Sequence, residues 1–147
     1  MKGFMKKRTL GEFDKMAIGD ENLSNNLQGA LPAISLVSQT SISTAFMNDV
    51  DPDMVFAQQV YGYKGDNNVL IGITTSGNSK NVVNAVKIAN AFKMNTIGMT
   101  GESGGMLKNL CTVTLRAPAM QVYRVQEYHL PIYHALCAMV ESEFFEV

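Results

Sequence analysis

Short apolar runs and segments with helical spacing alternate along most of this chain. Four apolar runs bounded by turn residues indicate β-strands, at residues 31–37, 69–75, 95–100 and 112–116. The run at 69–75 is apolar on both faces, which is typical of a central strand in a parallel sheet. Apolar residues recur at helical spacing elsewhere and predict helices at 42–47, from about 51, and at 80–92, 106–110 and 122–144. Asp51 can cap the second of these helices, with Pro52 at its first position.

Strands separated by helices predict a parallel sheet with right-handed crossovers, so the fold class is α/β. With 147 residues, the chain is expected to form a single domain over residues 1–147. Residues 31–147 would form the α/β body. Residues 1–8 resemble the end of a helix, and the polar, weakly patterned residues 9–29 predict an extended loop or lid.

Composition narrows the class of partner. Hydrophobic residues make up 46% of the chain and charged residues 17%, which is ordinary for a globular protein, and the net charge of −1 gives no electrostatic footprint for nucleic acid. The one basic cluster, at residues 2–8, has no interleaved aromatic residues and is interpreted as a solvated helix face. Neither a signal peptide nor an apolar run of about 20 residues is present, so a cytoplasmic location is expected and no membrane partner.

Two cysteines, Cys111 and Cys137, lie far apart in the chain and outside any CxxC spacing. A disulfide framework or a structural zinc site is therefore not expected. Both cysteines fall in apolar patterns, which predicts buried thiols.

The segment from Leu70 to Ser79 carries the most chemical information, because a buried strand leads there into a loop rich in glycine and hydroxyl groups. Ligands bind at the carboxyl ends of strands in parallel sheets, and a helix that starts after Ser79 turns free N–H groups toward the loop. With the hydroxyls of Thr74, Ser76 and Ser79, these groups suit a phosphate. The alternative is structural, with Ser79 a simple N-cap and Gly77 a turn residue, and the pattern alone favours neither. The loop is neither a Walker A motif nor a GxGxxG motif.

The sequence of the same loop also resembles a motif of a known protein family. The hexapeptide Thr74-Thr-Ser-Gly-Asn-Ser79 resembles the STSGNS-type phosphate loop of sugar isomerase (SIS) domains, and Thr100-Gly-Glu-Ser-Gly-Gly105 is similar to their TGxxGG turn. Arg124-Val-Gln-Glu-Tyr-His129 resembles the RIQEIH helix of the phosphoheptose isomerase branch. Leu31-Pro-Ala-Ile-Ser35 and Asn48-Asp49 extend the similarity, which runs to about Val140.

This resemblance implies a flavodoxin-like, three-layer αβα fold with a parallel sheet. It also implies a homo-oligomer, a tetramer or dimer, that binds a phosphorylated sugar and converts sedoheptulose 7-phosphate by aldose–ketose isomerisation. Carried over to this chain, the resemblance makes Thr74, Thr75, Ser76 and Ser79 ligands of the phosphate and of nearby hydroxyls. Asn48 and Asp49 would bind substrate hydroxyls. Gln126 would be catalytic and substrate-binding, His134 would be the proton donor and acceptor, and both would ligate zinc in members that bind it.

The predicted catalytic helix also has a structural interpretation, because a lone histidine among apolar residues is more often structural than catalytic. Gln126 and His134 are separated by about 12 Å along a regular helix and point within about 80° of each other. They can flank a sugar phosphate, and Pro131 between them favours a kink. His129 is expected on a different side from Gln126, with a structural or supporting role. Tyr123 stands where the family often has an aspartate, which removes a carboxylate charge.

Two parts of the family pattern are not matched. These are a strand with a GNGGS-type loop and a following helix with a glutamate base, and Glu12 and Glu21 do not fit that glutamate. The unmatched strand lies inside the family's sheet, so we expect an N-terminally truncated chain that is inactive as an isomerase. The alternatives are a non-catalytic phosphosugar-sensing or protein-assembly module, and a generic flavodoxin-like nucleotide binder. The second alternative explains neither Gln126 nor His134.

Overall fold

The structure is a computed structural model that describes residues 8–145. It divides into two compact units. One unit is residues 35–130, and the other combines the chain up to residue 34 with residues 131–147.

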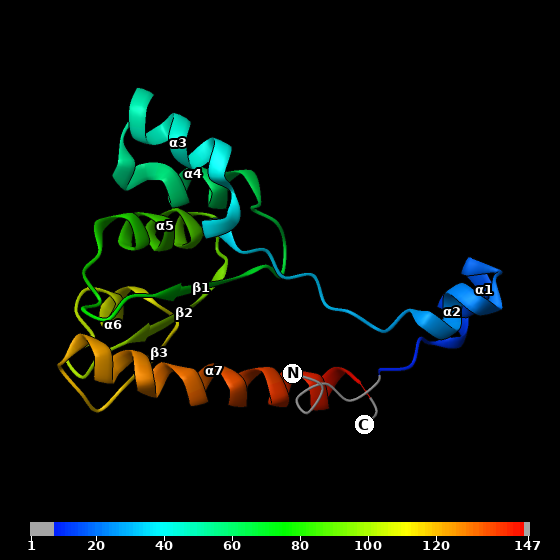
Figure 1. Ribbon diagram of the computed structural model, residues 1–147. Helices are drawn as coiled ribbons and strands as arrows, with labels where there is room; N and C mark the ends of the chain where they lie inside the picture. The colour runs from blue at the N-terminus through cyan, green and yellow to red at the C-terminus, as the bar shows by residue number, and fades with distance from the viewer. Residues whose placement is uncertain (1–7, 146–147) are drawn as a thin grey trace. The chain divides into compact units, whose positions relative to one another are not determined.

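The first of these units contains a parallel sheet of three strands in the order β1-β2-β3 (Figure 1). The strands are β1 (Val69–Ile73), β2 (Asn95–Thr100) and β3 (Val113–Arg116). The crossovers are made by α5 (Lys80–Ala91) and α6 (Leu107–Leu110). In the register, Ile73 lies opposite Met99, and Thr100 lies opposite Arg116. This arrangement confirms the predicted α/β class and three of the four predicted strands.

Four further elements precede the sheet in this unit, namely the 3₁₀ helix η1 (Leu36–Ser38), α3 (Thr40–Asp49), the 3₁₀ helix η2 (Pro52–Met54) and α4 (Val55–Gly62). The Asp51 carboxylate accepts a hydrogen bond of 2.8 Å from the Asp53 N–H, and Pro52 is the first residue of η2. The predicted helix start is therefore confirmed. Figure 1 shows α5 next to the sheet, with α4 and α3 outside it.

The core lies on the face of the sheet that α5 covers. Val83, Val86 and Leu107 form one buried cluster, which joins α5 to α6. Val60, Ala85 and Ala89 form another, which joins α5 to α4. Small and β-branched side chains on α5 allow it to pack closely against elements on both sides.

The long helix α7 (Val122–Phe144) also begins in this unit. Its residue Val125 is fully buried with Ala117 and Ala119, which follow β3. In Figure 1 the start of α7 lies on the side of the sheet opposite α5. The helix continues through Pro131.

The predicted strand at 31–37 is wrong. Residues 31–34 are extended without a pairing partner, and Leu36–Ser38 form the 3₁₀ helix η1. A β-strand is stable only when its N–H and C=O groups pair with a neighbouring strand, and no strand of the described chain pairs with this segment. Leu31, Ile34 and Val37 are exposed, so apolar composition alone did not produce a strand.

The predicted loop at 9–29 is also wrong, because it contains α1 (Glu12–Ile18) and α2 (Glu21–Asn26). Gly19 ends α1 in the left-handed conformation, and the Asp20 carboxylate caps α2 by accepting from the Leu23 N–H at 2.9 Å. The adjacent capping residues Gly19 and Asp20 indicate the two helices in the sequence. The hydrophobic pattern of this segment is too weak to do so. Neither helix buries a residue.

The second unit combines α1, α2 and the end of α7. Arg8 forms an ion pair of 3.2 Å with Glu141, and its guanidinium lies 5.3 Å from the ring centroid of Phe145. The helix end predicted for residues 1–8 falls almost entirely outside the described residues. Cys137 is exposed, so the prediction of two buried thiols is wrong for it. Cys111, in the unit with the sheet, is half-buried, and burial raises the pKa of its thiol.

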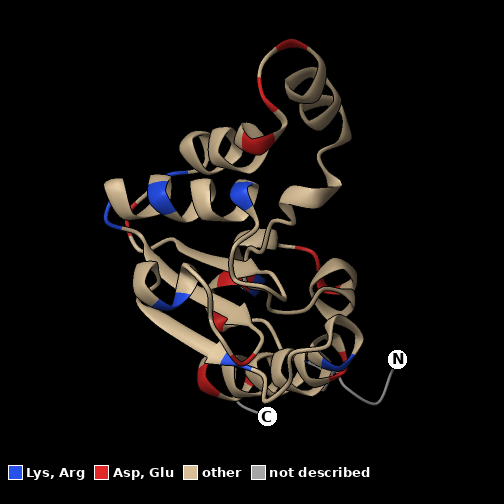
Figure 2. Ribbon diagram, turned by 90° about the vertical axis from the view of Figure 1, so that its left-hand side faces the viewer, with Lys and Arg blue, Asp and Glu red and all other residues tan. Residues whose placement is uncertain are grey.

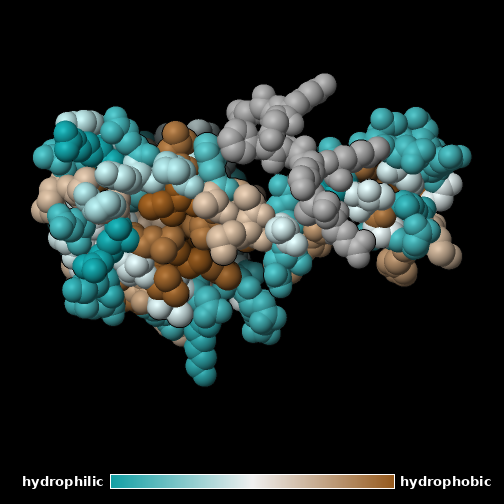
Figure 3. All heavy atoms as spheres, turned by 90° about the horizontal axis from the view of Figure 1, so that it is seen from below, coloured by the Kyte–Doolittle hydropathy of each residue, from teal (hydrophilic) through white to brown (hydrophobic). Residues whose placement is uncertain are grey.

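Charges are dispersed over the described part of the chain. Figure 2 shows Lys and Arg scattered among Asp and Glu rather than gathered on one face. On the unit that contains the sheet, Figure 3 shows hydrophobic residues gathered in a patch. None of the helices in the described residues is long and apolar enough to cross a membrane.

Replacement of Leu107 tests the core. Leu107→Ala removes a fully buried side chain from the junction of α5 and α6, so we expect the free energy of unfolding to fall by about 2–5 kcal/mol. Leu23→Ala is the matched control, because Leu23 is 53% exposed on α2, and it should change stability by less than about 0.5 kcal/mol. Urea denaturation followed by circular dichroism measures both. Equal effects of the two variants would contradict this core.

Candidate functional site

The loop between β1 and α5, residues 74–79, begins where the sheet ends. The Thr74 N–H donates to the Met99 carbonyl at 3.0 Å, which continues the pairing of β1 with β2 by one residue. The Gly77 N–H then donates to the Thr74 carbonyl at 3.2 Å and closes a tight turn. Gly77 has a φ of 69°, a conformation that glycine adopts without steric cost. The chain therefore reverses direction directly at the carboxyl end of β1.

The hydroxyl groups of this loop converge. Thr74 Oγ1 lies 2.7 Å from Ser79 Oγ and 3.5 Å from Ser76 Oγ. Ser79 directly precedes α5, but its side chain makes no capping hydrogen bond. The alternative interpretation of Ser79 as a simple N-cap therefore lacks its defining contact. The start of α5 keeps the positive end of its dipole without a side-chain cap from Ser79.

A second loop, residues 101–106, holds the first one in place. The Gly101 N–H donates to the Thr75 carbonyl at 2.9 Å, and the Leu107 N–H donates to the Gly77 carbonyl at 3.2 Å. The Met106 N–H donates to Asn78 Oδ1 at 2.9 Å. A Cβ atom added at Gly77 would overlap the carbonyl oxygen of Gly104. The two loops thus form one hydrogen-bonded layer with room only for glycine at this contact.

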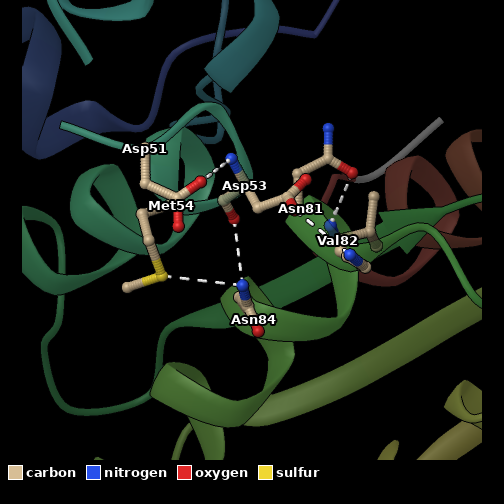
Figure 4. A network of polar contacts seen from close by, with 7 residues as sticks. Asp51, Asp53, Met54, Asn81, Val82 and Asn84 are labelled. Carbon is tan, nitrogen blue, oxygen red and sulfur yellow. Dashed lines mark hydrogen bonds and ion pairs between the residues drawn. The ribbon is translucent and has the colours of Figure 1, made fainter. Parts of the chain in front are cut away.

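The first turns of α5 are anchored to η2 from the other side. Figure 4 shows the Asn84 side chain between these elements, with Nδ2 donating to the Asp53 carbonyl at 3.1 Å and lying 3.5 Å from Met54 Sδ. Asn81 Oδ1 accepts from the Val82 N–H at 2.9 Å in the same view. These contacts fix the direction of α5 relative to the loop that precedes it.

Helix α7 contributes His129, which is buried at 5% exposure. His129 Nε2 lies 3.2 Å from the Thr100 carbonyl oxygen, which also accepts from the Ala117 N–H at 2.8 Å. A carbonyl oxygen can only accept, so this contact requires the proton on Nε2. Nδ1 of the neutral ring is then a hydrogen-bond acceptor.

Side chains of α4, β1, the loop at residues 74–79, α5 and α7 line an open pocket of about 370 Å³, a size typical of small-molecule sites. Its lining combines hydroxyl, amide and imidazole groups with apolar side chains and holds no carboxylate, lysine or arginine. The lining residues are Phe56, Ile73, Thr74, Thr75, Ser79, Asn81, Val82, Gln126 and His129. The pocket can therefore bind an anion through neutral donors and cover one side of an organic ligand with apolar surface.

The structure brings four of the predicted site residues together, since Thr74, Thr75, Ser79 and Gln126 all line the pocket. The other four lie outside its lining, three of them in the unit of residues 35–130. Ser76 is exposed, and its Oγ accepts from the Asn78 N–H at 3.1 Å. Asn48 and Asp49 are exposed at the end of α3.

His134, the predicted proton donor and acceptor, lies further along α7 in the other unit. Its exposed ring meets the Tyr133 ring edge-on, with centroids 4.8 Å apart. The pocket lining does not include it.

Sequence reasoning missed five lining residues, which are His129, Asn81, Phe56 and the apolar Ile73 and Val82. His129 was expected on a different side from Gln126, yet both line the pocket, because residues three apart are neighbours on a helix surface. Asn81 is the second residue of the helix that the sequence predicts from about Lys80, so its place beside the loop could have been predicted. Phe56 comes from α4, and nothing in the local sequence links it to the loop.

Within residues 8–145, no group of three or more His, Cys, Asp or Glu side chains is placed to hold a metal ion. Gln126 and His134 alone fall short of the three protein ligands that even an open zinc site uses. The described residues therefore do not fit a zinc ion.

A polar pocket at the carboxyl ends of the strands is where α/β domains with parallel sheets bind their ligands. The model of the SIS domain family matches residues 40–141. This chain belongs to the SIS domain family.

Several members of the SIS domain family that are similar to this chain are phosphoheptose isomerases. The phosphoheptose isomerase of Aliarcobacter butzleri is 42% identical over 113 residues, which are 77% of this chain and 60% of that protein. A solved phosphoheptose isomerase from Neisseria gonorrhoeae superposes with a TM-score of 0.74 at 40% identity, over 76% of this chain and 62% of that one. One from Francisella tularensis gives 0.74 at 36% identity, over 77% and 63%. The chain thus spans about 60% of the length of these relatives.

Replacement of Gly77 tests the contact between the two loops. Gly77→Ala places a Cβ on a left-handed residue and against the Gly104 carbonyl, so we expect a loss of about 1–3 kcal/mol in stability. Gly62→Ala is the matched control, because a Cβ there meets nothing within 4 Å, and stability should hold or rise by up to about 1 kcal/mol. Thermal unfolding compares them. A Gly77→Ala protein as stable as the control would contradict the close approach of the loops.

Proposed function

We propose that this chain binds a phosphorylated sugar, with the phosphate at the loop of residues 74–79. The convergence of Thr74 and Ser79 hydroxyls, 2.7 Å apart at the uncapped start of α5, is the observation that carries the proposal. Hydroxyl donors and a helix N-terminus together favour a dianionic group without a lysine or arginine. The apolar side chains Phe56 and Val82, which also line the pocket, suit the carbon face of a sugar.

The reaction we infer is aldose–ketose isomerisation of sedoheptulose 7-phosphate, as part of a protein of the phosphoheptose isomerase kind. The relatives bear that name, and the pocket offers groups that suit the chemistry. The Gln126 amide can hold sugar hydroxyls, and the unprotonated Nδ1 of His129 is an acceptor in the buried part of the site. Isomerisation moves a proton between adjacent carbons, and a neutral imidazole suits proton transfer near pH 7.

The proposal also assigns roles to the other site residues predicted from the sequence. Thr75 would bind the phosphate or a nearby hydroxyl. Ser76, Asn48 and Asp49 would contact the substrate only if their segments move toward the pocket. His134 would act as proton donor and acceptor. We also expect a cytoplasmic homo-oligomer, which the exposed apolar side chains of α7 support, among them Tyr123, Leu130, Met139 and Phe144.

One observation favours a second candidate, a non-catalytic phosphosugar-binding module. No carboxylate lines the pocket, whereas the resemblance implies a glutamate base. Both candidates predict binding, and only the isomerase predicts turnover. Because the chain spans about 60% of its relatives' length, we expect these 147 residues to bind sugar phosphate without turning it over.

Substitution of Ser79 tests the phosphate site. Ser79→Ala removes one hydroxyl of the converging pair, and a hydrogen bond to a charged group contributes about 1.5–3 kcal/mol, so we expect affinity for sedoheptulose 7-phosphate to fall at least tenfold. Ser103→Ala, in an exposed position of the second loop, is the control and should bind as the wild type does. Isothermal titration calorimetry measures both, with inorganic phosphate as competitor. Unchanged affinity in Ser79→Ala would exclude this loop as the phosphate site.

Turnover by this chain would exclude the second candidate, the non-catalytic module. We expect no conversion of sedoheptulose 7-phosphate by the 147-residue chain in a nuclear magnetic resonance assay that follows the sugar directly. Conversion that Gln126→Ala abolishes, with binding retained, would establish the isomerase and contradict the expectation of inactivity.

A further inference from the structure

Asn81 contributes an amide group to the lining of the pocket. It is the second residue of α5, two positions after Ser79, and its side chain is half-buried. The first residues of a helix surround the point at which the helix dipole attracts an anion. The Asn81 side chain is therefore beside the position proposed for the phosphate.

The backbone of α5 fixes the orientation of this amide. Asn81 Oδ1 accepts a hydrogen bond of 2.9 Å from the Val82 N–H (Figure 4). A backbone N–H can only donate, so the atom that faces it is the amide oxygen, and Nδ2 is the opposite end of the group. Figure 4 shows Nδ2 turned away from Val82. Within residues 8–145 Nδ2 donates to no other atom, so both of its protons are available to a ligand.

The paired hydroxyls of the loop supply few donors for a phosphate. Thr74 Oγ1 and Ser79 Oγ lie 2.7 Å apart, and the hydrogen bond between them uses the proton of one of the two. Only the other proton of the pair is left for a ligand. A phosphate group presents three strong acceptor oxygens, and the pocket lining holds no lysine or arginine. A phosphate in this pocket therefore requires a further neutral donor.

Two amide side chains line the pocket, those of Asn81 and Gln126, and they differ in how firmly they are held. Gln126 is exposed on α7, and no hydrogen bond within residues 8–145 fixes its side chain. Asn81 is already oriented by its bond to Val82. A donor that is oriented before the ligand arrives loses less conformational entropy on binding. Asn81 is thus the better placed of the two to hold an anion.

We propose that Asn81 is a substrate-binding residue that determines specificity for an anion, with Nδ2 donating to the phosphate of the bound sugar phosphate. The inference rests on the proposed function, because that function places the phosphate at the loop of residues 74–79. Since Oδ1 is committed to Val82, the side chain offers only N–H groups to the pocket. It attracts an oxyanion and has no free acceptor for a cation.

An aspartate at this position would keep one contact of the side chain and reverse the other. A carboxylate has the same shape as the amide, and one of its oxygens can accept from the Val82 N–H. The second oxygen would take the place of Nδ2 and replace a donor with a negatively charged acceptor. Because like charges a few ångströms apart repel strongly, the pocket would then reject a phosphate.

Replacement of Asn81 by aspartate tests this specificity. In Asn81→Asp we expect the affinity for sedoheptulose 7-phosphate, measured by isothermal titration calorimetry, to fall by about a hundredfold. The Tm should stay close to the wild-type value, because the helix dipole favours a carboxylate in the first turn. Asn109→Asp is the matched control, since it makes the same charge change at an exposed residue outside the lining and should bind as the wild type does. Wild-type affinity in Asn81→Asp would overturn the proposal.

Replacement of Asn81 by alanine separates direct contact from repulsion at a distance. Asn81→Ala removes the donor without adding a charge, and we expect the affinity to fall about tenfold. Circular dichroism checks that the variant is folded. Inorganic phosphate, titrated in the same way, probes the anion alone and should lose affinity for Asn81→Asp as the sugar phosphate does. Wild-type affinity of Asn81→Ala for the sugar phosphate, or of Asn81→Asp for inorganic phosphate, would exclude the contact with the phosphate.

The wild-type titration distinguishes this proposal from the proposed function. A wild-type chain that binds sugar phosphate while both Asn81 variants bind equally well would remove only the role of Asn81. A wild-type chain that does not bind sugar phosphate at all would overturn the proposed function and this inference with it.

Discussion

The parallel pairing of β1 with β2 is the constraint on which the site depends. Because Ile73 lies opposite Met99, both strands end at the same edge, and the loops that follow them start side by side. The hydrogen bonds from Thr74 to Met99 and from Gly101 to Thr75 continue the pairing into the loops. A shift of one residue in this register would turn the side chain of Thr74 to the other face of the sheet.

The pocket that results is neutral. Its polar groups are hydroxyls, amides and one imidazole, and the nearest lysine in sequence, Lys80, is exposed and lies 4.0 Å from Asp53. Anion binding in such a site depends on the orientation of dipoles and hydroxyls rather than on a net positive charge. The fixed geometry of the loop therefore favours anion binding. A mobile loop would lose conformational entropy when its polar groups gathered around a phosphate, and this loss would weaken binding.

The sequence by itself determined the α/β class, three strands, the helices from residue 40 onward and the hydroxyl-rich loop, since each depends on periodicity, capping and glycine within a few residues. Thr74, Thr75, Ser79 and Gln126 were predicted for the site and line its pocket, whereas Asn48, Asp49, Ser76 and His134 do not line it. The roles of all eight residues stay predictions. The tertiary structure alone decided that 31–37 is not a strand, because strand formation depends on a neighbour distant in sequence. It also decided that Phe56 and His129 line the same pocket as the loop. Their positions depend on how the helices pack, and a short-range sequence pattern does not encode helix packing.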